Sequence, residues 1–314
     1  MKPLTLFLAL TTLTAADLRL GFIGTDTSHV TAFTKILNDP ASPDHIPGAR
    51  IVAAYKGGSP DLDESRTRID RFTKELQDKW QIKIVDTIPD LLQQVDAVLI
   101  TSVDGRVHLG QARAAIAAHK PLFIDKPLAS TLEDAREIAR LAKEAGVPWF
   151  SASSLRFSGI AKMRTPDLAG AITWGPGPLE EHHHLDLAWY AIHPIEMLYT
   201  LMGPGCEEVT RISTSDSDVI VGRWKDGRIG TVRAMRPYAD YGAIAFHKNP
   251  KAQSSEVATK VDSGYAPLVR EIVQFFQSGR PPVANEETLE IFAFLDAAQR
   301  SKESGGRPVR IGNP

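Results

Sequence analysis

Leu18-Arg-Leu-Gly-Phe-Ile-Gly24-Thr-Asp26-Thr-Ser-His29 is the stretch that decides the fold of the first half of the chain. An apolar strand that runs into a glycine turn and then a helix is typical of a doubly wound sheet, where helix N-terminal N–H groups receive a pyrophosphate. The usual pattern of that turn is G-x-G-x-x-G. Counted from Gly24, its second and third glycines are replaced by Asp26 and His29. Because a carboxylate repels a pyrophosphate, the sequence predicts the fold together with an altered way of holding the nucleotide, or a different ligand.

The composition is that of an ordinary globular protein with room for two domains. The chain has 314 residues, of which 43% are hydrophobic and 24% are charged. Its formal net charge of -2 gives no reason to expect a nucleic-acid partner or binding to an anionic membrane surface. The single cysteine, Cys206, excludes an intramolecular disulfide and any cysteine-based metal cluster.

The first sixteen residues have the order of a secretory signal peptide. Lys2 precedes an apolar run from Pro3 to Leu13, and small residues follow up to Ala16. The run is too short to span a bilayer, so no membrane association is expected once residues 1–16 are removed. This interpretation predicts a periplasmic or secreted protein. The alternative is an additional apolar strand or helix on the first domain.

Residues 17–150 alternate between apolar strand patterns and helical patterns, which predicts a Rossmann-type domain with a doubly wound parallel sheet. One helix is expected around Ile69–Trp80, where apolar residues recur at helical spacing. Another is expected to begin at the capping box Ser130-Thr-Leu-Glu133 and to end at Gly146. The expected strands are Leu18–Gly24, Arg50–Tyr55, Ile82–Val85, Asp96–Thr101, Pro121–Ile124 and Pro148–Ser151.

Residues 151–314 have a different pattern and predict an α+β domain built on a largely antiparallel sheet. A hairpin is expected at Lys225-Asp-Gly227, between strands at Asp218–Trp224 and Arg228–Met235. Further strands are expected at Ala243–His247 and Glu256–Val261, and helices at Ala266–Ser278 and Glu286–Glu303.

Two loops at the carboxyl ends of expected strands carry polar side chains, where open α/β sheets bind their ligands. The loop Ser102-Val-Asp104-Gly-Arg-Val-His108 fits this position, but it equally fits a plain turn in which Asp104 caps a helix. The turn Asp125-Lys126-Pro127 presents a lysine that can polarise a hydroxyl or carbonyl, or exchange a proton if its pKa is depressed. Taken alone, Lys126 would be a surface lysine, so its role depends on the motifs that accompany it.

With these motifs in view, the chain resembles the glucose-fructose oxidoreductase/inositol dehydrogenase/MocA family over nearly all of the expected mature length. Asp125-Lys126-Pro127 is similar to the Glu-Lys-Pro motif of that family, and His108 stands where its Asn-x-x-His loop has a histidine. The stretch from His193 to Gly203 resembles the family's His-x-x-Asp run. These blocks are the most specific parts of the resemblance.

The resemblance implies an NAD(P)-dependent oxidoreductase acting on a carbon of a sugar or cyclitol. An exported enzyme of this kind is expected to hold its cofactor tightly, because it cannot draw on a cytoplasmic pool. His193 takes the hydroxyl proton in this reading, Lys126 orients the oxygen, and Glu196, one helical turn further, orients the imidazole. Pro194 fits the first turn of a helix and sets His193 at its entrance. A homo-oligomer is a further implication. The residues expected to contact the cofactor are Gly24, Thr25, Asp26, Thr27, Ser28, His29, Lys56, Ser102, Asp104, His108 and Lys126.

Three positions depart from the family pattern and bear on this chemistry. The nucleotide turn has lost two glycines. Lys56 stands at the end of the second strand in place of an acid, which favours NADP over NAD, because a cation suits a phosphorylated ribose. The family's catalytic Asp four residues before the histidine is Trp189 here, and since an indole exchanges no protons, the relay is incomplete or passes through another group.

The segment Glu180-Glu-His182-His-His184-Leu-Asp186 has no counterpart in the family pattern. Two of its histidines, His182 and His184, could bind a divalent metal together with Asp186 or His193. A solvated loop or a set of sugar-binding groups is the preferred interpretation. Two other functions stay open on the same fold: a carbohydrate lyase or hydrolase, metal-assisted or not, and a non-catalytic sugar-binding protein.

Overall fold

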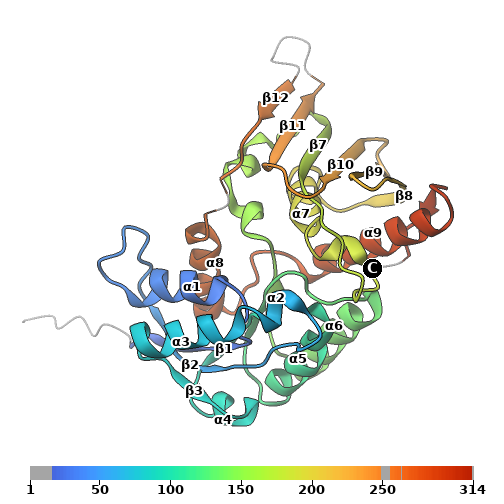
Figure 1. Ribbon diagram of the computed structural model, residues 1–314. Coiled ribbons are helices and arrows are strands. Elements are labelled where there is room, and N and C mark those ends of the chain that lie inside the picture. The colour runs from blue at the N-terminus through green and yellow to red at the C-terminus, as the bar shows by residue number, and fades with distance from the viewer. Residues whose placement is uncertain (1–15, 249–254, 263, 313–314) are drawn as a thin grey trace, which may run out of the picture.

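The computed structural model describes residues 16–248, 255–262 and 264–312. Two sheets organise this part of the chain, and Figure 1 shows the first sheet and its helices below the second. The predicted signal peptide lies outside the described residues except for Ala16. Within the described ranges, no helix has the length and apolar character needed to cross a membrane.

The first sheet is parallel, with strand order β3-β2-β1-β4-β5-β6. Each strand expected from the sequence is present, and its ends differ from the prediction by no more than one residue. The strands are β1 (Leu18–Ile23), β2 (Ala49–Tyr55), β3 (Lys83–Val85), β4 (Ala97–Ile100), β5 (Leu122–Ile124) and β6 (Trp149–Ser151). The helices are α1 (His29–Asn38), α2 (Asp63–Arg66), α3 (Ile69–Trp80), α4 (Ile88–Leu92), α5 (His108–Ala117) and α6 (Leu132–Ala145).

The start of α6 differs by one residue from the expected capping box. Thr131, in an extended conformation, is the N-cap, and its side chain accepts a hydrogen bond from the N–H of Asp134 at 3.0 Å. The carbonyl of Ser130 instead accepts from the N–H of Leu185 at 3.1 Å, which ties the loop before α6 to the second half of the chain. The predicted end is confirmed, because Gly146 caps the helix with a φ of 66°.

The second sheet has strand order β12-β11-β7-β10-β9-β8-β13. Among the described residues, β7 and β10 run parallel and the other neighbouring pairs are antiparallel, so the mostly antiparallel sheet is confirmed. The sequence missed β7, β8 and β13. The strands are β7 (Leu168–Pro176), β8 (Cys206–Ser213), β9 (Ser217–Trp224), β10 (Ile229–Met235), β11 (Gly242–His247), β12 (Ser255–Ala258) and β13 (Val309–Arg310), and the helices are α7 (Ile192–Met202), α8 (Ala266–Ser278) and α9 (Asn285–Glu303).

Helix α8 follows the second sheet in sequence but packs on the first. Leu268, Ile272 and Phe275 are buried in one cluster with Phe22 of β1 and Phe33 of α1. In Figure 1, α8 stands beside α1 in the lower half of the molecule. Each of these large apolar side chains contributes roughly 1.5–3 kcal/mol when fully buried. This packing holds the segment before α8, including Tyr265, close to the carboxyl edge of the first sheet.

Candidate active site

The turn after β1 is closed tightly against its neighbours. Gly24 has a φ of 94°, and a Cβ there would lie 2.4 Å from the backbone nitrogen of Ser102, so only glycine fits. The N–H of Thr25 donates to the carbonyl of Lys56 at 2.9 Å. Gly24, Thr25 and Asp26 are buried, whereas the three residues that follow, Thr27 to His29, line a cavity.

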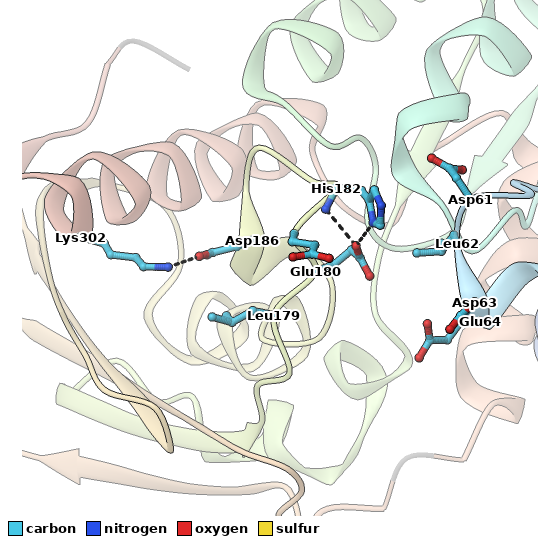
Figure 2. Close-up of a pocket in the computed structure, with 10 residues that line it drawn as sticks. Asp61, Leu62, Asp63, Glu64, Leu179, Glu180, His182, Asp186 and Lys302 are labelled. Atoms are coloured by element: carbon cyan, nitrogen blue, oxygen red, sulfur yellow. Dashed lines mark hydrogen bonds and ion pairs between the residues drawn. The ribbon is translucent and has the colours of Figure 1, made fainter.

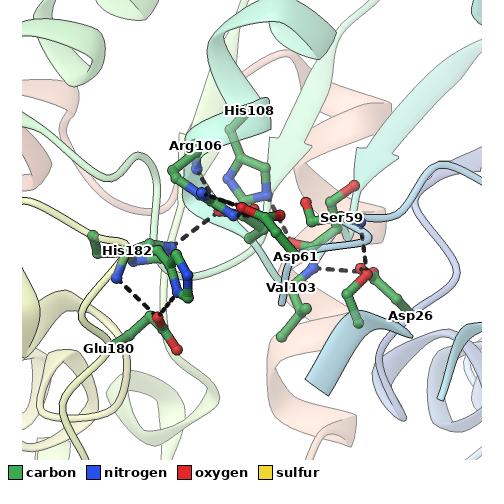
Figure 3. A network of polar contacts seen from close by, with 12 residues as sticks. Asp26, Ser59, Asp61, Val103, Arg106, His108, Glu180 and His182 are labelled. Carbon is green, nitrogen blue, oxygen red and sulfur yellow. Dashed lines mark hydrogen bonds and ion pairs between the residues drawn. The ribbon is translucent and has the colours of Figure 1, made fainter. Parts of the chain in front are cut away.

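Asp26 points into the protein. Its carboxylate accepts hydrogen bonds from Ser65 Oγ at 2.6 Å and from the N–H of Val103 at 3.0 Å, as Figure 3 shows. Burial raises the pKa of Asp26, although these two hydrogen bonds oppose the shift. The carboxylate therefore ties the β1 turn to α2 and to the loop after β4, and its side chain is fully shielded instead of facing a ligand.

A cavity of about 300 Å³ lies at the carboxyl edge of the first sheet and brings the predicted lysine and histidine together. Lys126 and His193 both line it, so they face a single small-molecule site. Its lining residues are Thr27, Ser28, His29, Glu64, Arg68, Val103, Lys126, Ser154, Leu155, Trp189, Tyr190, His193, Tyr238, Tyr241 and Tyr265.

Lys126 follows β5 and is partly buried. Its ammonium lies 5.4 Å from the ring centre of Tyr190, a cation–π contact. Burial lowers the pKa of Lys126, and the nearby Arg68 adds to this effect while Asp125 opposes it. The lysine is therefore a stronger acid than a solvated one, as a group that donates to a reacting oxygen should be.

His193 lies in the first turn of α7, followed by Pro194, as predicted. Its Nδ1 lies 2.7 Å from Ser153 Oγ, and its ring packs edge-on against Tyr190 and Tyr241. Burial lowers the pKa of His193 well below the ordinary value, and the charges of Lys126 and His29 lower it further. The imidazole is therefore neutral near pH 7.

The expectation that Glu196 orients His193 is wrong. The Glu196 carboxylate accepts from Arg156 Nε at 2.5 Å, and Arg156 also donates to Glu287 at 2.7 Å. Two carboxylates around a buried guanidinium satisfy its charge, which turns Glu196 away from the imidazole. Ser153 takes the orienting position, because a serine hydroxyl is within reach of Nδ1.

His29 and Asp125 form a pair that the sequence did not predict. The His29 Nδ1 contacts a carboxylate oxygen of Asp125 across the turns after β1 and β5. Burial acts to raise the pKa of Asp125, but His29 outweighs it, and the net effect is a lowered pKa. The third glycine position of the nucleotide turn is thus occupied by a histidine whose ring is held at the cavity wall.

The other predicted cofactor residues do not line this cavity. His108 is buried, and its Nε2 lies 2.8 Å from the carbonyl of Ser102. Asp104 is also buried, and its carboxylate accepts a hydrogen bond from the N–H of Arg106. The same carboxylate lies 3.0 Å from Nε2 of His183, and this contact links the two halves of the chain. Lys56 pairs with Asp70 at 2.6 Å on the surface. Ser102, Asp104 and His108 therefore build the wall behind the site.

A second cavity of about 620 Å³, shown in Figure 2, lies further out between the two halves of the chain. His182 contacts Glu180 at 2.5 Å, and Asp186 accepts from Lys302 at 2.6 Å and from Arg211 at 2.7 Å. His184 is exposed. Among the described residues, no group of three His, Cys, Asp or Glu side chains could hold a metal ion. The carboxylate and imidazole of this segment serve ion pairs within the protein.

Ser153 and the tyrosines of the cavity were not predicted from the sequence. Tyr190 could have been proposed from the sequence, because it lies three residues before His193 and just before the expected helix. Tyr241 and Tyr265 could not, because each lies in a loop whose distance from Lys126 depends on the packing of the second sheet and α8.

The residues of the β1 turn fit the pyrophosphate of a nicotinamide dinucleotide. Ser28, the N-cap of α1, makes no side-chain cap hydrogen bond, and Thr27 and Ser28 line the cavity at the helix N-terminus. A helix N-terminus at the switch point of a doubly wound sheet favours a phosphate. The inward orientation of Asp26 removes its carboxylate from that surface.

A parallel sheet with a cavity at its carboxyl edge, covered by a second mixed sheet, defines a protein of the two-domain Rossmann class. Residues 21–153 match the model of the Gfo/Idh/MocA family, described as an oxidoreductase family with an NAD-binding Rossmann fold. This match covers the first sheet and its helices, and it confirms the resemblance found in the sequence.

Two curated relatives and one solved structure illustrate the similarity. A segment of 67 residues is 45% identical to 1,5-anhydro-D-fructose reductase of Ensifer adhaerens, covering 21% of this chain and 20% of that protein. Another of 53 residues is 49% identical to inositol 2-dehydrogenase of Paracoccus denitrificans, covering 17% and 16%. The matches thus span a fifth or less of these relatives. An oxidoreductase of Agrobacterium radiobacter, solved with NAD+, L-tartaric acid and magnesium, has a TM-score of 0.72 at 16% identity, with 95% of this chain and 99% of that one covered.

Proposed function

We propose that the protein is an NAD(P)-dependent oxidoreductase acting on a hydroxyl-bearing carbon of a sugar or cyclitol. The observation that carries this proposal is the shared cavity of Lys126 and His193 at the carboxyl edge of a family-matched NAD-binding domain. The names of the curated relatives, a sugar-derivative reductase and an inositol dehydrogenase, support the substrate class.

The bound cofactor supplies the acceptor or donor of a hydride. Lys126 donates a hydrogen bond to the reacting oxygen, and its lowered pKa makes that donation stronger. His193, neutral and oriented by Ser153, presents Nε2 to the same oxygen or to a neighbouring hydroxyl. Tyr190 and Tyr241 offer ring faces and edges for the apolar face of a sugar ring.

NADP is the proposed form of the cofactor. Lys56 and Arg66 line a further cavity of about 240 Å³ beyond the end of β2. Both are exposed, and among the described residues their ion pairs are with Asp70 and Asp63 at the surface. Such pairs are weak and readily exchanged for a phosphate. The two cations support recognition of a phosphorylated ribose.

Export is the proposed localisation, in the periplasm or outside the cell, with a cofactor held tightly enough to accompany the protein. The support is the signal-peptide pattern of residues 1–16. Amino-terminal sequencing of protein recovered from the periplasm or medium tests this, with Asp17 as the expected first residue. Recovery of a chain that still starts at Met1 in the cytoplasm contradicts it.

Self-association through the outer face of the second sheet is also proposed. Ile229, Phe246 and Val257 share that face by strand register, and Ile229 and Val257 are more than half exposed, at 55% and 52%. Apolar residues grouped on one sheet face favour an interface. Light scattering on wild type and Ile229→Glu tests it: the proposal requires an oligomer that the variant weakens.

The activity is tested by cofactor content, binding and turnover. Denatured protein is examined for released nicotinamide, and thermal shift is measured with NADP+ and NAD+. Turnover is then followed as nicotinamide absorbance with a panel of aldoses, inositols and anhydrosugars. We expect a cofactor-dependent shift and turnover of at least one polyol. Sugar binding without any response to nicotinamide would instead identify a sugar-binding protein on this fold.

A further inference from the structure

The first residue of α1 carries an imidazole where the nucleotide turn ordinarily has its last glycine. The His29 side chain is 12% exposed and the Asp125 side chain 5% exposed, so their contact is almost fully desolvated. Asp125 is itself fixed, because its other carboxylate oxygen accepts from the N–H of Lys126 at 2.8 Å. A buried carboxylate held in this way fixes the orientation of an imidazole and determines which ring nitrogen stays available.

The packing of the His29 ring determines which nitrogen is available. The ring stacks on Phe33 with 5.4 Å between centres and lies 4.7 Å from the ring centre of Tyr265. Nδ1 is engaged by Asp125, and among the described residues no hydrogen bond is made to Nε2. Since His29 lines the cavity with Lys126 and His193, Nε2 is the ring nitrogen available to a ligand.

Three basic groups of the cavity, His29, Lys126 and His193, differ in their immediate partners. His193 has a serine hydroxyl beside Nδ1, and burial with the charges of Lys126 and His29 lowers its pKa well below the ordinary value. Lys126 also lies in a position where burial disfavours its charge. His29 alone has a carboxylate in direct contact with its ring. His29 is therefore the imidazole of the cavity that a carboxylate holds in a fixed orientation.

We propose that His29, paired with Asp125, is the catalytic acid–base residue of the oxidoreductase reaction. This inference rests on the proposed function. In the oxidation direction, the substrate C–H bond breaks as hydride and its electron pair leave to the oxidised cofactor. The O–H bond breaks as its proton passes to Nε2 of His29, and the alcohol becomes a carbonyl. In reduction the same proton returns to the oxygen, so atoms and electrons balance in both directions.

Other charged groups bear on this step. Asp125, Lys126, His193 and Tyr265 face His29 from β5, α7 and the segment before α8, and Arg68 and Glu64 close the cavity from the side of α2 and α3. Oxidation requires unprotonated His29, so kcat for oxidation falls at acidic pH. Reduction requires the protonated form, so kcat for reduction falls at alkaline pH.

The kinetic test compares His29→Gln, Asp125→Asn and the control His45→Gln. His45 lies in the loop after α1, where its Nδ1 lies 3.1 Å from the carbonyl of Ile36. We expect His29→Gln to lower kcat roughly 10²–10⁴-fold, the usual contribution of a general base, with little change in KM. Its oxidation profile should also lose the acidic limb. His45→Gln should keep both. A His29→Gln enzyme with wild-type kcat and an unchanged acidic limb would overturn the proposal.

A second measurement does not depend on turnover. Nitrogen-15 spectra of the histidine rings in the intact protein report which nitrogen carries the proton. We expect His29 to hold its proton on Nδ1 at neutral pH, and Asp125→Asn to shift the ring signals of His29 and not of His45. Protonation on Nε2 alone would refute the dyad. If wild type turns over no alcohol while the Nδ1 form is present, the proposed oxidoreductase function fails and the imidazole–carboxylate pair stands.

Discussion

The inner and outer cavities between the two halves of the chain both contain lysine and histidine side chains, but they differ in how these charged groups are paired. In the outer cavity, charges meet partners: Asp186 has Lys302 and Arg211, and Glu180 has His182. In the inner cavity, Lys126 and His193 face one another with no carboxylate in direct contact with either side-chain nitrogen among the described residues, and burial lowers the pKa of both. Charges that are satisfied stabilise a fold, whereas charges that are desolvated and unsatisfied are costly and mark a site of chemistry.

The comparison predicts its largest effect at the two lysines. Lys126→Met should lower kcat by roughly 10²–10⁴-fold, because it removes the donor to the reacting oxygen. It should not lower the free energy of unfolding, since the variant replaces a partly buried ammonium by an apolar side chain of similar length. Turnover and urea unfolding of the same samples measure both quantities.

The matched control is Lys302→Met at the outer cavity. It removes an ion pair with Asp186, whose carboxylate keeps Arg211 as a partner. Its kcat should stay close to wild type. If Lys302→Met lowered turnover as strongly as Lys126→Met, the proposed difference between the two cavities would be wrong.

The next largest effect is expected on the free energy of unfolding, at the buried ion pairs of Arg156. Arg156→Met leaves Glu196 and Glu287 without their shared guanidinium, and Glu196 is already a carboxyl whose pKa burial raises. Loss of one partner of a buried ion pair costs about 3–5 kcal/mol. Urea unfolding should show this loss. Arg140→Met, which breaks exposed pairs with Glu137 and Glu144, should leave the urea midpoint close to that of wild type, because exposed ion pairs contribute little.

A smaller and pH-dependent effect is expected where Asp104 meets His183. Burial alone would raise the pKa of Asp104, but hydrogen bonds from His183 and Arg106 outweigh it and hold the pKa below its ordinary value. A carboxyl with a lowered folded-state pKa stabilises the fold above its unfolded pKa of about 4, and this stabilisation is lost as the pH falls toward the folded value.

Asp104→Asn should therefore cost about 1–3 kcal/mol at pH 7 and flatten the decline of the urea midpoint below about pH 4. Asp216→Asn, on an exposed turn where the carboxylate meets only Ser215, serves as the control. An unchanged acid profile in Asp104→Asn would show that the link between the two halves of the chain adds nothing to stability.

The sequence predicted the first sheet almost residue by residue, because each parallel strand is a short apolar run set between turn signals. It also predicted that Lys126 and His193 face one site, because each residue belongs to a motif that can be recognised from a few neighbouring residues. It failed at Glu196 and Asp26, whose orientations depend on Arg156 and on Ser65, residues far away in sequence. It listed His29 as a cofactor contact and missed Asp125 as its partner, because two loops separated by 96 residues meet only in the folded protein.

The smallest effect tests the far end of the nucleotide site, where the sequence favoured NADP. Lys56 is exposed and pairs only with Asp70, so Lys56→Ala should change the free energy of unfolding by no more than about 0.5 kcal/mol. If Lys56 receives a ribose phosphate, the variant should lose about 1 kcal/mol of NADP+ binding, roughly fivefold in Kd, while its Kd for NAD+ stays the same. Fluorescence titration with each dinucleotide measures the difference, and Lys83→Ala on β3, whose amine contacts Gln94, is the control. Equal losses of affinity for NAD+ and NADP+ would mean that Lys56 contributes only a nonspecific electrostatic attraction. Lys56 would then not support the proposed preference for NADP.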